Sequence, residues 1–559
     1  PDADTRDRLI AEKIGPADWA SHLGRSDSLF VNASTWGLML TGRLIDVEDE
    51  AKRDLGGFLK RLTARVGEPV IRQAVGAAVK MMGEQFVLGR TIDDALARAR
   101  REGYLCSFDM LGEGARTAHD AERYEKIYAD AIEAVGRARG PGLKPEDGHG
   151  VSVKLSALSP RYEAVQEARV WEELYPRIRR LALIAARHDL NFAIDAEEAD
   201  RLVLSLKLVD RLAREHELGE WTGLGVVVQA YQKRGLAVIE GLEALARSTG
   251  RRIMVRLVKG AYWDSEIKRA QIAGRPGYPV FTTKPATDLS YLVCADALIK
   301  ASPRLYPQFA THNAHTLAAV RLMAVRAGQR IEHQRLHGMG EALYRAAGGN
   351  VSLRAYAPVG GHEELLPYLV RRLLENGANT SFVHALLDER VPAEDVVRDP
   401  IAAVEAQPGP HPKIPLPAHL YGPARTNPLG RDYSIADTRA AAARATDLIA
   451  ADVLTAGPIV GGRLLPGAGA EPMHSPVDGS ILLGGVSAAT PADIDAAAKA
   501  ARGAQPVWDR LGGPGRAQVL RAMGAALEGE MDRLVALLAR EAGKTLNDAV
   551  AEVREAVDF

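Results

Sequence analysis

Two arginines one helical turn beyond a tyrosine form an arrangement that could do chemistry. Tyr368, Arg371, Arg372 and Glu375 are spaced by three, four and seven residues in an otherwise largely apolar stretch. In a helix these spacings place the four side chains on one stripe. Paired guanidinium donors match the two oxygens of a carboxylate, so the stripe predicts a site for a carboxylate-bearing ligand. A solvated helix face with a Glu–Arg pair is the alternative interpretation.

Charged side chains also occur at the ends of short apolar runs. Lys154 and Asp195 lie at the ends of two neighbouring runs, and Arg256 lies within another. We expect Lys154 and Asp195 to face each other, either as a structural ion pair or as a pair that holds the geometry and charge of a site. The Arg256 guanidinium could point at an electron-rich cofactor atom or form a salt bridge. Other runs carry polar residues at the same end, namely Asp109, Gln229, His312 and Gln334.

The segment from Lys259 to Trp263 joins small residues to large aromatic ones. Small residues let a ring approach the backbone, and the aromatic side chains can then wall a pocket. Packing in the core is the alternative for Trp263. We expect Tyr356 and Tyr368 to close the same pocket.

Three histidines raise a different possibility, a metal-dependent hydrolase. His312, His333 and His337 lie near predicted strand ends, where histidines can bind a catalytic metal. There is no His-x-His pair and no strand-end carboxylate clearly shared with them, so we expect no metal and favour histidines that hydrogen-bond a cofactor or a core carbonyl. A G-x-G-x-x-G fingerprint after a strand is also absent, so no Rossmann dinucleotide site is indicated.

The elements that must position these residues alternate between short strands and amphipathic helices over residues 101–385. Eight such strands predict an α/β fold, a closed (β/α)₈ barrel whose C-terminal strand ends build the active site. The predicted strands are Leu105–Met110, Val151–Ser156, Phe192–Asp195, Leu224–Gln229, Ile253–Val258, Phe309–Asn313, Ile331–Leu336 and Leu353–Ala357.

The barrel is flanked by three further predicted regions. Residues 1–100 have helical periodicity and predict an arm with a small helical domain. Residues 386–450 read as a linker, because the prolines concentrated between 385 and 435 break regular elements. Residues 451–559 begin a new pattern with helices near 491–503, 514–529 and 530–542, and a further helix at the end of the sequence.

Composition limits the partners that we expect. The 559 residues carry 71 basic and 72 acidic side chains, a net charge of −1, so there is no overall field for nucleic acid or an anionic membrane. Cys106 and Cys294 are the two cysteines and lack zinc-site spacing, which favours a reducing cytoplasm. Because no apolar run is long enough to cross a bilayer, any membrane contact is expected to be peripheral.

Four motifs carry a resemblance to a known family. They are Val153–Leu158, Ile194–Glu198, Val255–Trp263 and Tyr368–Asn379. Together they resemble the proline dehydrogenase domain of bacterial proline utilization A, over roughly residues 100–385. The resemblance implies a barrel that binds FAD non-covalently and oxidises L-proline to Δ1-pyrroline-5-carboxylate by hydride transfer to flavin N5. It also implies electron transfer to a membrane quinone, in the first step of proline catabolism to glutamate.

The resemblance also assigns roles to residues. Lys154, Asp195, Tyr262, Arg371 and Arg372 are implied as catalytic residues. The implied substrate pocket comprises these residues with Ala261, Leu336, Tyr356 and Tyr368. The implied flavin contacts are Gln229, Arg256, Val258, Gly260, Ala261, Trp263, Thr282, Lys284, Thr311, His312, Asn313, Gln334 and Glu375. Glu113 resembles the acidic partner of Arg371 in a gate over the substrate.

Residues 451–559 resemble the start of an aldehyde dehydrogenase, through Ser475–Gly479 and Glu541–Thr545. That chemistry needs a cysteine nucleophile, and this stretch has none. We therefore expect no aldehyde oxidation here, and expect NAD-dependent oxidation of glutamate semialdehyde only in a complete bifunctional parent. Some family members begin with a ribbon-helix-helix module. We find none before Pro1 and expect no nucleic-acid partner.

Overall fold

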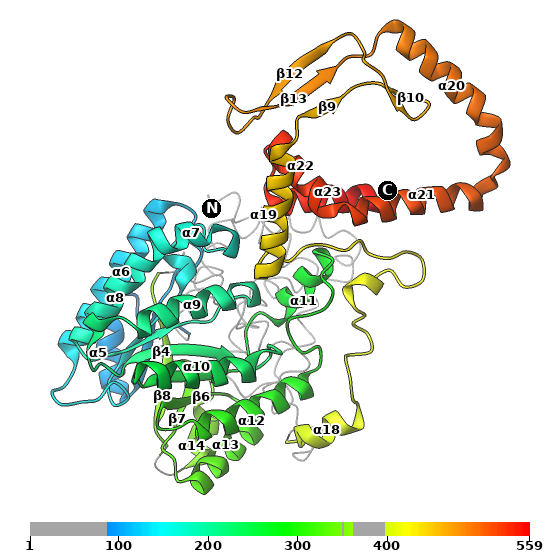
Figure 1. Cartoon of the computed structure of the whole chain (residues 1–559). Helices are drawn as coiled ribbons and strands as arrows, with labels where there is room; N and C mark the ends of the chain where they lie inside the picture. Colours follow the sequence, from blue (N-terminus) through cyan, green and yellow to red (C-terminus); the bar gives the residue numbers. More distant parts are fainter. Residues whose placement is uncertain (1–85, 349–350, 362–396) are drawn as a thin grey trace, which may run out of the picture.

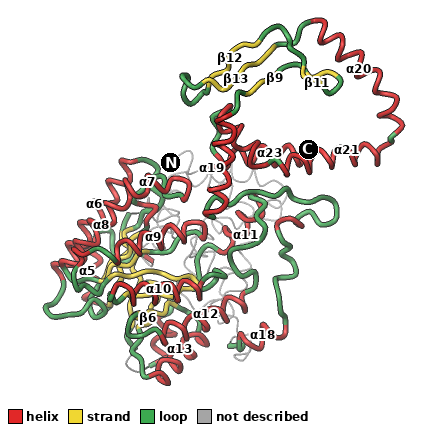
Figure 2. The backbone as a smooth tube through the Cα atoms, viewed as in Figure 1, coloured by secondary structure: helices red, strands yellow, loops and turns green. Residues whose placement is uncertain are grey.

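The computed structural model describes residues 86–348, 351–361 and 397–559. Its centre is a closed barrel of eight parallel strands in the order β1 to β8 (Figures 1 and 2). The barrel closes where β8 pairs with β1 in parallel, from Leu105 opposite Arg354 to Met110 opposite Val359. The strands are β1 (Leu105–Met110), β2 (Gly150–Val153), β3 (Asn191–Ile194), β4 (Leu224–Gln229), β5 (Ile253–Val258), β6 (Leu305–Ala310), β7 (Glu332–Leu336) and β8 (Leu353–Val359).

Alternation along each strand separates two environments. Cys106 and Phe108 on β1 belong to the apolar core between the strands and the surrounding helices. Ser107 and Asp109, which alternate with them, are buried polar residues that contact Ser152 and Lys154. Since successive strand side chains point to opposite faces, the second set lies inside the barrel. The interior is therefore polar as well as buried, which is the setting for a site.

Helices cover the outside of the barrel (Figure 1). They are α5 (Ile92–Glu102), α6 (Ala118–Ala138), α8 (Tyr175–Arg187), α9 (Leu202–Ala213), α10 (Gly235–Thr249), α11 (Trp263–Ile272), α12 (Lys284–Lys300), α13 (Ala314–Ala327) and α14 (Glu341–Ala347). Capping boxes at Thr91 and Thr117 fix the starts of α5 and α6. Leu96 of α5 lies in the same core as the strands, so this helix packs on the barrel, although most of it falls within the region 1–100 predicted as a separate domain.

The eight predicted strands are confirmed, with shifts in their bounds. The first, fourth and fifth match the observed strands, and the second and third begin one residue earlier and end sooner. The sixth differs most, because Phe309–Asn313 was predicted and Leu305–Ala310 is found. The side chain of Asn313 accepts a hydrogen bond from the Thr316 backbone and caps α13, so these polar residues start a helix instead of extending the strand.

Beyond the barrel, regular structure resumes within the predicted linker. The short helix α18 (Pro400–Ala406) and a single 3₁₀ turn at Pro417–His419 fit a proline-rich connection. The 16-residue helix α19 (Ala436–Ala451) does not, although it lies almost wholly inside the range 386–450. It packs with α22 (Met531–Glu541) and α23 (Leu546–Asp558) in a small apolar cluster around Tyr433 and Met531.

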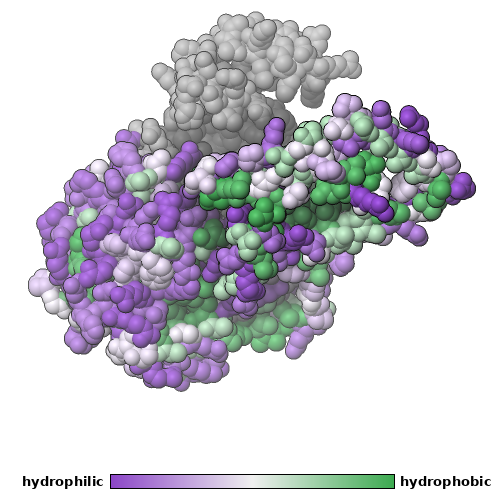
Figure 3. All heavy atoms as spheres, turned by 45° about the horizontal axis from the view of Figure 1, so that its top comes forward, coloured by the Kyte–Doolittle hydropathy of each residue, from purple (hydrophilic) through white to green (hydrophobic). Residues whose placement is uncertain are grey.

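The C-terminal part projects from the barrel beyond α19 (Figure 1). It contains β9 (Leu454–Ala456), β10 (Ile459–Val460), β11 (Arg463–Leu464), β12 (Ala470–His474) and β13 (Leu482–Ser487), followed by α20 (Pro491–Arg510) and α21 (Gly512–Gly529). Hydrophobic side chains are more frequent on the surface there than over the left side of the barrel (Figure 3). Among the described residues, no helix is long and apolar enough to cross a membrane.

Candidate active site

A compact charged cluster lies at the C-terminal ends of the barrel strands. Lys154 follows β2 and Asp195 follows β3, and the Lys154 Nζ lies 3.3 Å from Asp195 Oδ2. The expected pair is therefore present. Both residues are buried, with 7% and 9% of their surface exposed. In such barrels this end of the strands is where active sites are built.

Asp109 is the closest anionic partner of Lys154. The Lys154 Nζ donates to both Asp109 carboxylate oxygens, at 2.8 and 2.9 Å. Burial lowers the pKa of Lys154, but Asp109, Tyr356 and Asp195 outweigh that effect and hold the pKa well above its usual value. Lys154 therefore stays protonated at neutral pH. Asp109 is one of the strand-end polar residues in the sequence, but its place in the site was not predicted, because its bond to Lys154 depends on the register between β1 and β2.

Tyr356 of β8 joins the cluster. Its hydroxyl donates to Asp195 Oδ2 at 2.8 Å and accepts from Lys154 Nζ at 3.2 Å. Burial, followed by the nearby Asp109 and Asp195 carboxylates, raises the pKa of Tyr356 well above its usual value. The phenol therefore remains neutral and ties the two sides of the barrel together.

Arg256 of β5 completes the cluster. Its Nη2 donates to Asp195 Oδ1 and to Ser152 Oγ, both at 2.8 Å, and its guanidinium carbon lies 5.0 Å from the centroid of the Tyr356 ring. The salt bridge that we had considered as an alternative thus exists. Lys154 and Arg256 offset the formal charges of Asp109 and Asp195. The cluster is self-compensated, so an anionic ligand needs cations from elsewhere in the chain.

The predicted flavin contacts on β4 and after β5 occupy the same end of the barrel. The Gln229 amide donates to the Glu197 carbonyl at 3.0 Å and accepts from Gln232 at 2.6 Å. Val258 ends β5, Gly260 follows with a φ of 126°, and Ala261 is exposed. The positive φ explains why a glycine is placed at this turn.

Trp263 begins α11, directly after Tyr262. Its indole donates to the Phe281 carbonyl at 2.8 Å, and its ring packs against a small core with Tyr231 and Tyr278. Both the pocket-wall and the core interpretations of Trp263 are therefore compatible with its position.

Thr282 and Lys284 lie at the start of α12. The Thr282 hydroxyl accepts from the His411 backbone N–H at 2.9 Å, which brings the proline-rich connection to this position. Lys284 donates to Asp288 at 2.6 Å, and Asp288 also pairs with Lys259. This pairing with lysines opposes burial and lowers the pKa of Asp288.

The segment after β6 supplies three more predicted contacts. The Thr311 hydroxyl accepts from the Asn313 backbone, and the Asn313 side chain caps α13. His312 Nε2 accepts from the Leu336 backbone N–H at 3.1 Å, so that nitrogen carries no proton. Leu336, the last residue of β7, packs with Tyr356 against a small apolar cluster.

Tyr368, Arg371, Arg372 and Glu375 lie outside the described residues. Glu113 follows β1 and is half-buried. Its expected partner, Arg371, lies outside the described residues. These assignments stay predictions.

Several buried polar atoms in and around the barrel lack a hydrogen-bond partner within the described structure. Among them are Arg256 Nε, a donor from β5, and Gln334 Oε1, an acceptor from β7. An unpaired buried polar atom costs free energy, on the order of 1–3 kcal/mol, so such atoms call for a partner. Both residues were predicted to contact the flavin. A planar heterocycle that carries both hydrogen-bond acceptors and donors fits this pair of free groups.

The histidines do not assemble into a metal site in the part of the chain that the structure describes. No group of three His, Cys, Asp or Glu side chains able to hold a metal occurs among the described residues. His333 and His337 are buried, and this burial lowers the pKa of each to about 4. They are therefore neutral at physiological pH.

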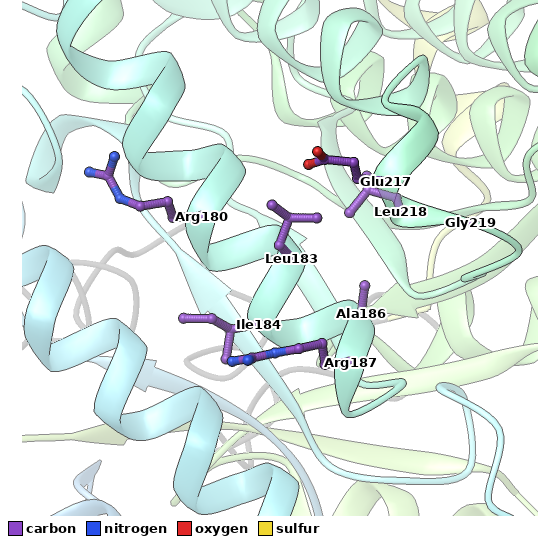
Figure 4. Close-up of a pocket in the computed structure, with 8 residues that line it drawn as sticks. All are labelled: Arg180, Leu183, Ile184, Ala186, Arg187, Glu217, Leu218 and Gly219. Atoms are coloured by element: carbon purple, nitrogen blue, oxygen red, sulfur yellow. The ribbon is translucent and has the colours of Figure 1, made fainter.

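A surface depression lies away from this cluster, between α8 and the 3₁₀ turn His216–Leu218 (Figure 4). Leu183, Ile184 and Leu218 line it, and Arg180 and Arg187 lie at its edge. Both arginines pair with glutamates of α6. The depression is on the outside of the helical layer and contains none of the predicted site residues.

Family models match three parts of the chain. Residues 92–385 match proline dehydrogenase, and residues 467–559 match the aldehyde dehydrogenase family. Residues 1–86 match the DNA-binding domain of proline dehydrogenase. Our expectation of no nucleic-acid partner is therefore wrong. A net charge summed over 559 residues says nothing about the charge of one small module. The expectation also concerned only a module preceding Pro1, whereas the match begins at Pro1 itself.

Several similar proteins cover the whole chain. The bifunctional protein PutA of Escherichia coli (strain K12) is 49% identical over 582 residues, and that of Rhizobium meliloti is 48% identical over 572. The chain spans 44% and 46% of these proteins, less than half their length. A solved structure of proline utilization A with proline bound in remote sites is 44% identical, with a TM-score of 0.75, and the chain covers 53% of it.

The family model for proline dehydrogenase matches more than half of the residues, and the closed barrel with its charged cluster lies within the matched region. The chain belongs to the proline dehydrogenase family.

Proposed function

We propose that this chain oxidises L-proline to Δ1-pyrroline-5-carboxylate with non-covalently bound FAD. The observation that carries the proposal is the buried cluster at the barrel mouth, with its free donor on Arg256 and its free acceptor on Gln334. When bound, FAD would supply the hydride acceptor, at its N5 atom.

The charged cluster suits orientation better than proton abstraction. Lys154 and Tyr356 both have raised pKa values, so neither accepts a proton at neutral pH. Asp195 is held by Lys154, Arg256 and Tyr356, which leaves it little freedom to act as a base. Loss of a hydride from a carbon beside an amine needs a fixed geometry and no nucleophile from the protein, which matches this arrangement.

Arg371 and Arg372 would supply the cations that the cluster lacks. Because Lys154 and Arg256 are compensated by Asp109 and Asp195, binding of a carboxylate requires further positive charge. We propose that the two arginines hold the proline carboxylate and that Glu113 pairs with Arg371 when the site closes. Transfer of electrons to a quinone, with peripheral membrane contact, is part of the same proposal.

The segment matched to the aldehyde dehydrogenase family has no comparable cluster. Both cysteines of the sequence, Cys106 and Cys294, are buried in the barrel region, so residues 467–559 contain no thiolate nucleophile. We therefore propose L-proline oxidation as the activity of this chain.

Turnover tests the proposal. The purified protein is incubated with L-proline and a soluble quinone analogue, and formation of the cyclic imine product is measured with and without added FAD. We expect product that depends on FAD and on L-proline, and none with D-proline as the matched control. A protein that binds no FAD, or that holds FAD and forms no product, would refute the proposal.

A further inference from the structure

A fully buried ion pair lies inside the barrel, below the charged cluster. Arg354 of β8 donates to both carboxylate oxygens of Glu332 of β7, at 2.9 and 3.0 Å, and both side chains have no exposed surface. The remaining Arg354 donors bond to the carbonyl oxygens of Cys106, Glu146 and Gly148. All five guanidinium donors are therefore used, which holds the Glu332 carboxylate in one position.

One oxygen of that carboxylate collects three donors. Glu332 Oε1 accepts from Arg354 Nε at 2.9 Å, from Gln308 Nε2 at 2.9 Å and from Gln334 Nε2 at 2.8 Å. The last bond links the ion pair to Gln334, two residues further along β7 toward the C-terminal end of the barrel. Since residues i and i+2 share a strand face, Glu332 lies directly below Gln334 inside the barrel.

This bond determines which end of the Gln334 amide is available. An ionised carboxylate only accepts hydrogen bonds, so the amide must turn its NH₂ group toward Glu332. The reverse orientation would place two oxygens in contact. The carbonyl oxygen, Gln334 Oε1, is the buried atom that has no partner within the described structure.

We propose that Glu332 is a positioning residue that fixes Gln334 as a hydrogen-bond acceptor for the cofactor. The proposal rests on the proposed function, because the ligand is the flavin ring. An oxidised isoalloxazine carries a single ring N–H, in its imide. An acceptor that is fixed in place is therefore always available to pair with this donor. A freely turning glutamine would present its NH₂ group part of the time and leave the imide N–H unpaired.

A thermodynamic cycle on FAD affinity tests the proposal, with the dissociation constant measured on the apoprotein by quenching of FAD fluorescence. Gln334→Met removes the acceptor. The paired variant Glu332→Met/Arg354→Met removes the carboxylate that holds the Gln334 amide. Because it removes both members of the ion pair, it leaves no unpaired buried charge. Gln334→Met should weaken FAD binding about tenfold, the effect of one lost hydrogen bond. The paired variant should weaken it by less, roughly threefold, because an amide that turns freely still offers its carbonyl part of the time. All three changes combined should bind FAD as weakly as Gln334→Met alone.

Gln308→Met is the matched control. It removes a bond to the same Glu332 oxygen, of nearly the same length, without touching Gln334, and should leave the FAD dissociation constant within about twofold. If the paired variant does not fold, Glu332→Asp keeps the charge opposite Arg354 but withdraws the carboxylate from Gln334, and takes its place in the cycle.

Two outcomes separate this proposal from the proposed function. If the losses in FAD-binding free energy caused by Gln334→Met and by the paired variant add up in the triple variant, while the unmodified protein binds FAD normally, the role of Glu332 is overturned. L-proline oxidation would then still stand. Failure of the unmodified apoprotein to bind FAD would overturn the proposed function itself, and this proposal with it.

Discussion

Replacing Asp109 by Asn should destabilise the barrel strongly, although the two side chains have nearly the same shape. Asp109 is 1% exposed and both of its oxygens accept from Lys154. In the variant, two buried cations, Lys154 and Arg256, would share one carboxylate, that of Asp195. Removing one partner of a buried pair costs about 3–5 kcal/mol, so we expect a loss of that size in the free energy of unfolding.

The assay is urea denaturation of the two proteins at pH 7, with Asp130→Asn as the control. Lys126 and Asp130 form a pair of the same length, 2.8 Å, but their side chains are 76% and 64% exposed. Solvent screens such a pair, so the control should change the free energy of unfolding by less than about 0.5 kcal/mol. Equal effects of Asp109→Asn and Asp130→Asn would refute the claim that the charged cluster is desolvated and mutually dependent.

Three further changes probe other parts of the account. Arg371→Ala should weaken L-proline binding roughly a hundredfold, seen as a higher KM, with nearly normal FAD content, and loss of FAD instead would contradict the assignment to the substrate carboxylate. Arg256→Met removes the free donor, so the dissociation constant for FAD should rise about tenfold, and an unchanged value would exclude a bond from Arg256 to the flavin. Burial lowers the pKa of His149, His333 and His337 to about 4, below the unfolded value near 6.5, so the unfolded state binds more protons between these pH values. Stability should fall as pH drops from about 6.5 to about 4, by up to about 3 kcal/mol for each histidine, and a urea midpoint that does not change over this range would contradict the prediction.

The pattern of the sequence predicted the barrel because eight apolar runs alternate with amphipathic helices. It also predicted the pairing of Lys154 with Asp195, since both residues end neighbouring strands and parallel strands finish at the same edge. Those inferences need only local periodicity and one rule of topology. The bounds of the sixth strand were beyond this reasoning, because the role of Asn313 as a helix cap becomes visible only once α13 is placed.

Other contacts between neighbouring strands were harder to predict. Asp109 and Lys154 are 45 residues apart, and their bond depends on the register between β1 and β2. Glu332 and Arg354 resemble ordinary surface residues in the sequence, and only closure of the barrel shows that they are fully buried. The prediction of no nucleic-acid partner failed for another reason, because it used the charge of the whole chain where the relevant unit is residues 1–86.

The most direct test of the central claim is a single anaerobic reduction of the FAD-loaded protein by L-proline, followed by flavin absorbance. If the barrel mouth holds flavin and substrate together, the oxidised-flavin absorbance will bleach, with one cyclic imine formed for each flavin reduced. FAD that stays oxidised at saturating L-proline, in a protein whose flavin dithionite still reduces, would contradict the claim.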